Sequence, residues 1–100
     1  MADPRLVKII GVKVPDANLG EYVTVKNLTR GGQLIQPVKG TDRSTVFNPA
    51  PNLQWVERDV VHAEIHGRIN GYARSTLNYG GTQMTISGLS ADTATPGADL

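Results

Sequence analysis

The residues best suited to chemistry are a histidine, a glutamate and a second histidine that alternate in the segment His62-x-Glu64-x-His66. They alternate with apolar residues, and this pattern is typical of a β-strand with one buried face and one exposed face. We therefore expect the three polar side chains on the exposed face. Imidazole and carboxylate groups are common zinc ligands, so this segment is the candidate metal site.

The spacing along a strand restricts this site. Alternate residues of a strand lie about 6.6 to 6.8 Å apart, so neighbouring members could share an ion. The two histidines lie about 13 Å apart and could share one only if the strand bends. The residues expected beside them on the next strand are poor or repulsive ligands: Asn78, Thr76 and Arg74. We expect no metal and no other cofactor, and we interpret this face as a solvated polar surface.

The segment Asp59 to Ser87 is expected to form three consecutive antiparallel strands. Val60 to Ile69 would be the first strand, Asn70-Gly71 the turn and Tyr72 to Tyr79 the second. A three-residue loop with a left-handed Gly71 keeps the buried and exposed faces consistent. This register pairs Val61, Ala63 and Ile65 with Tyr79, Leu77 and Ser75 on the buried face, and His62, Glu64 and His66 with Asn78, Thr76 and Arg74 outside.

A Gly80-Gly81 turn is expected to lead into the third strand of this segment. Glycine tolerates the positive φ of a primed two-residue turn. Counting out from that turn sets Leu77 opposite Met84 and Ser75 opposite Ile86, so the buried face would continue across all three strands.

Four more strands are expected before this segment: Leu6 to Val14, Glu21 to Leu28, Gln33 to Val38 and Ser44 to Phe47. Arg30-Gly31-Gly32 would close a hairpin, and Pro37 favours an edge position because its missing amide is harmless there. Trp55, the only tryptophan, is interpreted as a core residue that closes one end of the fold.

The fold class is therefore all-β. About seven short strands predict an antiparallel, immunoglobulin-like β-sandwich, and a small OB-like β-barrel is the alternative. Residues 1–89 would form one domain. Residues 90–100 lack both periodicity and apolar content, and are interpreted as a flexible tail or a truncated linker.

Composition sets limits on function. The net charge of +1 gives no general attraction to nucleic acid or anionic membrane. No apolar run reaches the length of a membrane span, and the first residues lack a secretory signal. We expect a virion or cytoplasmic location for the chain as written, and an extracellular one if it is a trimmed domain. The absence of cysteine excludes disulfides and thiolate chemistry but leaves the compartment open.

No nucleophile elbow and no glycine-rich phosphate loop occurs, so we expect that the protein is not an enzyme. A single-stranded nucleic acid could use the sheet face around Tyr72 for stacking and for phosphate contacts. The residues of that hypothetical site are Tyr72, His62, His66, Arg68 and Arg74. Glu64 lies in the middle of it, so we interpret nucleic-acid binding as the alternative only.

The order of several segments resembles a known class of module. The segments are VTVKNLTRGG, TDRSTVFNPA, WVERDVV and AEIHGRINGYA, and together they resemble immunoglobulin-like and prealbumin-like sandwich modules of the carboxypeptidase-regulatory type. Arg58-Asp59 departs from the pattern, since such modules often carry Gly-Asp there. The resemblance covers roughly residues 6 to 88 and implies a non-enzymatic spacer, adhesive or display module, of the kind found on cell surfaces and phage particles.

The sequence thus predicts a structural or interaction module, in a phage virion or a surface assembly. It would act by self-association, as a homo-oligomer, or by binding a larger protein scaffold. The residues expected at its interaction face are Arg68, Tyr72, Arg74 and Arg30, and the structural residues are Trp55 and Gly71.

Overall fold

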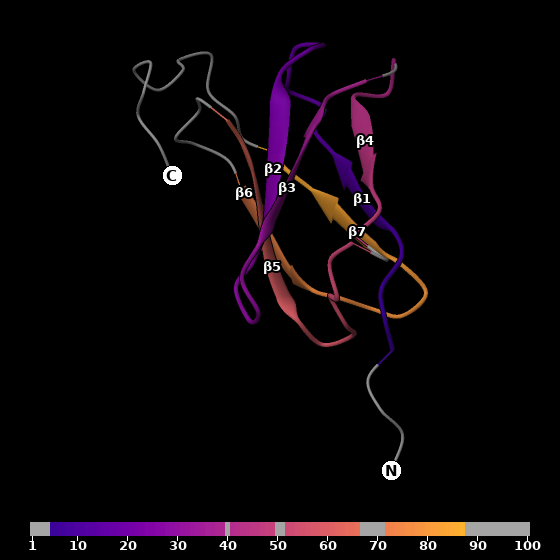
Figure 1. Cartoon of the computed structure of the whole chain (residues 1–100). Coiled ribbons are helices and arrows are strands. Elements are labelled where there is room, and N and C mark those ends of the chain that lie inside the picture. Colours follow the sequence, from indigo (N-terminus) through magenta and orange to yellow (C-terminus); the bar gives the residue numbers. More distant parts are fainter. Residues whose placement is uncertain (1–4, 40, 50–51, 67–71, 88–100) are drawn as a thin grey trace.

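The computed structural model describes residues 5–39, 41–49, 52–66 and 72–87. Seven strands form in this part of the chain, and two sheets pack face to face (Figure 1). The strands are β1 (Ile10–Lys13), β2 (Tyr22–Asn27), β3 (Gln33–Pro37), β4 (Ser44–Phe47), β5 (Val60–Ile65), β6 (Tyr72–Thr76) and β7 (Thr82–Thr85). The predicted all-β sandwich is confirmed, and the sheets do not close into the alternative barrel.

One sheet has the order β3-β2-β5-β6 and the other the order β4-β1-β7. Every pairing is antiparallel except that of β1 with β7, which is parallel. The strands divide between the sheets differently from a constant-type immunoglobulin domain, in which the first, second, fourth and fifth strands share one sheet. No segment that the structure describes forms a helix with the length and apolar content of a membrane span.

The core lies between the two sheets and is built by alternation. Along β5, Val61, Ala63 and Ile65 are fully buried, and on β2 their partners Val23 and Val25 are fully buried too. Trp55 is 2% exposed and lies against Gly32, at the end of the β2–β3 hairpin. These contacts remove the apolar face of each strand from water, which is the main stabilising contribution in a domain of this size.

The β2–β3 hairpin closes through the Arg30-Gly31-Gly32 turn, as predicted. Gly31 and Gly32 have φ values of 87° and 88°, which glycine adopts without the clash of a Cβ atom. β3 is an edge strand, so the predicted edge position of Pro37 is confirmed.

The predicted register between β5 and β6 is wrong by four positions. Ala63 lies opposite Ala73, not Leu77, and His62 lies opposite Arg74. Both registers place the same side chains inside and outside, because a shift by an even number of residues keeps every side chain on its face. Asn70 and Gly71, on which the turn argument rested, lie outside the described residues.

The predicted three-stranded unit is also wrong at its third strand. β7 leaves β6 and pairs with β1 in the other sheet. The crossing turn runs from Asn78 to Gly81, whose amide donates to the Asn78 carbonyl and whose φ is 114°. Met84 and Ile86 are buried as expected, but they reach the core from the opposite sheet. Tyr79, expected inside, is 48% exposed.

Candidate interaction face

The exposed side of the β3-β2-β5-β6 sheet collects most of the residues that the sequence singled out. We call it the outer face. It consists of alternate residues of the four strands, namely those from Gln33 to Pro37, Tyr22 to Lys26, Val60 to His66 and Tyr72 to Thr76. The intervening residues of β2 and β5 fill the core, so the alternation along each strand positions this face.

His62 is the centre of a polar cluster on the outer face. Its Nε2 atom lies 3.2 Å from Glu64 Oε1, and its Nδ1 atom lies 3.3 Å from an Arg74 guanidinium nitrogen. A guanidinium group can only donate, so Nδ1 accepts. The proton of the neutral ring is therefore on Nε2, where it is donated to Glu64.

Tyr72 completes this cluster from the edge strand. Its ring stacks on the His62 ring with 4.9 Å between centroids, and the Arg74 guanidinium carbon lies 5.9 Å from the centre of the Tyr72 ring. Two of the predicted face residues, Tyr72 and Arg74, are thus brought together around His62. The stacking restricts the orientation of the His62 and Tyr72 rings, and the nearby guanidinium group of Arg74 favours the same arrangement.

This geometry does not favour a metal at the His62-Glu64-His66 segment. Both ring nitrogens of His62 already have partners, and one partner is a cation that would repel a metal ion. Within the described part of the chain, no three His, Asp or Glu side chains come close enough to bind one ion.

Large apolar side chains occupy other positions of the outer face. Tyr22, Ile35 and Tyr72 are 51%, 50% and 61% exposed. Ile35 lies opposite Thr24, and Tyr22 lies opposite Pro37, so Tyr22 and Ile35 are diagonal neighbours on adjacent strands. The face therefore has an apolar area around Tyr22, Ile35 and Pro37 on β2 and β3, and a polar cluster with one stacked ring on β5 and β6.

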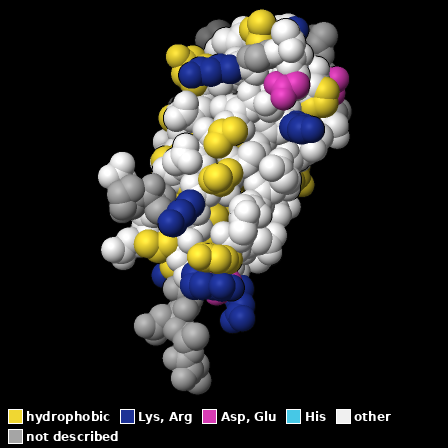
Figure 2. Space-filling model, turned by 90° about the vertical axis from the view of Figure 1, so that its right-hand side faces the viewer, with side chains coloured by type: hydrophobic (Ala, Val, Ile, Leu, Met, Phe, Trp, Pro, Cys, Tyr) yellow, Lys and Arg dark blue, Asp and Glu magenta, His cyan; other side chains and the backbone are white. Residues whose placement is uncertain are grey.

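The other side of the sandwich also exposes apolar side chains. Figure 2 shows the side on which β4 lies, where hydrophobic side chains lie among scattered Lys and Arg side chains and no histidine is seen. Val46 on β4 is 53% exposed. An open hollow of about 350 Å³ lies beside β4, lined in part by Asp42 and Ser44. The Ser44 hydroxyl donates to Asp42 at 2.8 Å and lowers the pKa of that carboxyl group. A carboxylate with a lowered pKa is a weak general base, so this pair is suited to holding the turn rather than to catalysis.

Arg30 and Arg68 complete the predicted interaction residues. Arg68 lies outside the described residues. Arg30 is part of the turn after β2, where its Nε atom lies 2.6 Å from Asp59 Oδ2. Its side chain is 45% exposed, whereas that of Asp59 is 3% exposed. Arg30 is thus held by a buried carboxylate at the end of the sheet.

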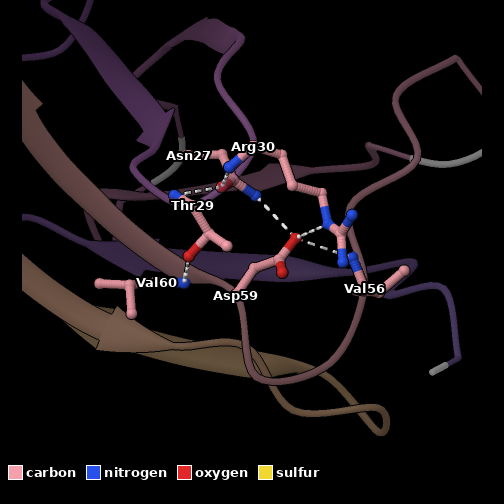
Figure 3. Close-up of polar contacts among 6 residues, drawn as sticks. All are labelled: Asn27, Thr29, Arg30, Val56, Asp59 and Val60. Atoms are coloured by element: carbon pink, nitrogen blue, oxygen red, sulfur yellow. Dashed lines mark hydrogen bonds and ion pairs between the residues drawn. The ribbon is translucent and has the colours of Figure 1, made fainter.

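Sequence reasoning missed the role of Asp59 (Figure 3). Its Oδ2 atom also accepts hydrogen bonds from Asn27 Nδ2 at 3.0 Å and from the Val56 amide at 3.1 Å. Asn27 Oδ1 in turn accepts from the amides of Thr29 and Arg30. Asp59 therefore ties the β2–β3 turn to the loop before β5. The sequence signal for this role was the Arg58-Asp59 pair. It stands where the sandwich modules that the sequence resembles often carry Gly-Asp.

Comparisons with known proteins add no assignment to this geometry. No family model, no curated protein and no solved structure matches the chain.

Proposed function

We propose that this domain is a non-enzymatic interaction module that binds a protein partner through its outer face. The partner would be a larger scaffold or further copies of the chain, in a virion or a surface assembly. The observation that carries the proposal is the set of half-exposed side chains Tyr22, Ile35 and Tyr72 on one regular sheet face. Burying the exposed half of one such side chain contributes about half of the roughly 1.5 to 3 kcal/mol of full burial.

The polar groups of the outer face support a specific contact. Arg74, His62 and Glu64 are linked to one another, so they are ordered before a partner arrives. Ordered groups lose less conformational entropy on binding than free ones. An apolar area with ordered polar groups beside it is the usual composition of a protein interface.

Photo-crosslinking from the outer face tests the proposal. Benzoylphenylalanine would replace Tyr22 or Tyr72, and Thr85, exposed on β7 of the other sheet, would be the matched control position. We expect adducts from Tyr22 and Tyr72 but not from Thr85 when the protein is irradiated in the cells or particles that contain it. An adduct of twice the chain mass would identify a second copy. Equal adducts from all three positions, or none, would contradict the proposal.

Single-stranded nucleic acid is the second candidate, favoured by the stacked His62 and Tyr72 rings next to Arg74. Two features weigh against it. Glu64 lies within the cluster, and His62 covers one face of the Tyr72 ring, which leaves less ring surface for a base. We expect no binding of a labelled oligonucleotide in the micromolar range. Tight binding that falls with salt and is lost in Arg74→Ala would favour this candidate instead.

A further inference from the structure

The outer edge of β6 carries backbone groups that do not bond to β5. The Leu77 amide donates to the Asp59 carbonyl at 2.8 Å, so by alternation Ala73 and Ser75 also bond to β5. Towards β2, on its other side, β5 bonds through different residues. The Leu28 amide donates to the Val60 carbonyl, and the His66 amide donates to the Tyr22 carbonyl. Tyr72, Arg74 and Thr76 therefore direct their amides and carbonyls away from β5. β6 ends its sheet, with no neighbour on that side among the described strands (Figure 1).

The other three edges offer less to an added strand. On β3 the outward positions are Gln33, Ile35 and Pro37, and the proline has no amide to donate. On β4 the Ser44 carbonyl already accepts from the Lys39 amide at 3.2 Å. β7 has only two outward residues within its bounds, Gln83 and Thr85. β6 has three, and each has both a donor and an acceptor; of their carbonyls, that of Thr76 accepts a hydrogen bond from the Ser75 hydroxyl at 3.4 Å.

The charge of the β6 edge selects the partner. Arg74 is its outward central residue, and no carboxylate in the described part of the chain forms an ion pair with it. Glu64, on the neighbouring strand β5, already forms an ion pair with His62. Lys26 lies opposite His62 on β2, on the side away from β6. Antiparallel pairing of two β6 strands centred on this residue would place Arg74 opposite its own copy, and like charges directly opposite destabilise a sheet. A strand with a carboxylate opposite Arg74 would gain a charge-assisted hydrogen bond.

We propose that the β6 edge binds an extended acidic segment of a partner protein as an added strand. The segment would bond to the backbone of Tyr72, Arg74 and Thr76, place a carboxylate against the Arg74 guanidinium and lay an apolar side chain beside Tyr72. This inference rests on the proposed function and adds the chemistry of the partner. Backbone bonds supply affinity in this mode of recognition, and side chains supply specificity.

A peptide titration followed by amide NMR tests the inference. The probe is a capped nine-residue peptide in which glutamate alternates with valine. We expect the largest shifts at the amides of Tyr72, Arg74 and Thr76. Arg74→Glu should weaken binding at least about tenfold, because it removes a charge-assisted hydrogen bond and places a like charge against the carboxylate of the peptide. Lys13→Glu, the same charge change at an exposed residue of β1, should leave binding unchanged.

Two further probes separate strand addition from simple charge attraction. A peptide N-methylated at every second residue keeps its charge but loses its amide donors, and it should not bind. A peptide with lysine in place of glutamate should not bind either. Equal binding of the N-methylated peptide, or of an oligonucleotide of the same charge, would overturn the inference.

The peptide titration also distinguishes this inference from the proposed function. If the peptide does not bind, or binds without regard to Arg74, while Tyr22 and Tyr72 still give crosslinks, then the acidic strand is wrong and the interaction face stands. If neither experiment gives a signal, both proposals fail.

Discussion

Asp59 is a buried carboxylate whose hydrogen bonds join the turn after β2 to the loop before β5. Three donors converge on its Oδ2 atom, from Asn27, Arg30 and the Val56 amide. A carboxylate with this little exposure would be costly to bury without them. Asp59 links segments that are far apart in the sequence. Its hydrogen bonds therefore fix the turn after β2 against the loop before β5.

Replacement of Asp59 by alanine should lower the free energy of unfolding by about 2 to 4 kcal/mol. The variant leaves Asn27 Nδ2 and the Val56 amide without their acceptor, and an unsatisfied buried donor costs about 1 to 3 kcal/mol. Urea unfolding would measure the loss. Asp59→Asn keeps an acceptor oxygen and should lose less. If the alanine and asparagine variants are equally stable, the hydrogen bonds to Asp59 do not stabilise the fold.

Arg58 has a φ of 78°, a conformation that costs a residue with a Cβ atom about 1 to 2 kcal/mol. Arg58→Gly should therefore raise the free energy of unfolding, by about 0.5 to 1 kcal/mol after the larger backbone entropy of glycine is subtracted. Arg43, with a φ of 56°, is the matched control. Its Nε atom donates to the Ala17 carbonyl at 3.0 Å, so Arg43→Gly should gain less. Equal gains at both positions would contradict this account of Arg43.

Arg5 donates a hydrogen bond to Glu57 and so holds the pKa of this carboxyl group below its ordinary value of 4.5. A depressed folded-state pKa stabilises the fold above about pH 4.5, and this contribution is lost as the pH falls through the folded-state value. In Arg5→Ala the pKa of Glu57 should rise towards 4.5, as measured by carboxyl NMR titration. Arg74→Ala, on β6, should leave it unchanged.

At the scale of elements, the hydrogen-bonding direction of β6 is the feature with the clearest consequence. Ala73 and Ser75 direct their amides to β5, whereas Tyr72, Arg74 and Thr76 direct theirs outward. The side chains of these three outward residues also lie on the outer face, so one set of residues supplies both the edge and part of the face.

Hydrogen exchange should therefore alternate along β6. The amides of Ala73, Ser75 and Leu77 should exchange slowly, because each has an intramolecular acceptor, and those of Tyr72, Arg74 and Thr76 should exchange quickly. Residue-resolved NMR exchange would measure the contrast. Slow exchange at Tyr72 and Arg74 would mean that another segment covers this edge, and β6 would then not be free to accept an added strand.

At the scale of the whole molecule, the described surface of the two sheets mixes exposed apolar side chains with a few ordered charge clusters. The His62 cluster is the clearest of these, and the contacts of His62 with Arg74 and Glu64 hold it together. A ligand raises the stability of a domain only when it binds the native state.

Zinc or nickel should accordingly leave the melting temperature of the domain unchanged. Thermal unfolding with and without the metal, followed by circular dichroism, would measure it. A rise of several degrees that disappears in His62→Ala would mean that His62 binds the metal in spite of Arg74. The same rise in His62→Ala would point to a site elsewhere in the chain.

The sequence by itself determined which residues of β2 and β5 face the core. Val23 and Val25, and likewise Val61, Ala63 and Ile65, are buried where the alternation placed them. The edge position of Pro37 and the glycine turn after β2 could also be predicted, because both follow from local backbone chemistry. The position of the His62 cluster on the outer face also came from alternation alone.

Only the tertiary structure decided which strands are neighbours. Alternation has a period of two, so it is unchanged when a strand shifts by four residues or moves to the opposite sheet. This is why Arg74 came to lie beside His62, and why Met84 reaches the core from the other side. The partners of Asp59 were equally hidden, because Asn27 and Arg30 are about 30 positions away and meet it only when β2 pairs with β5.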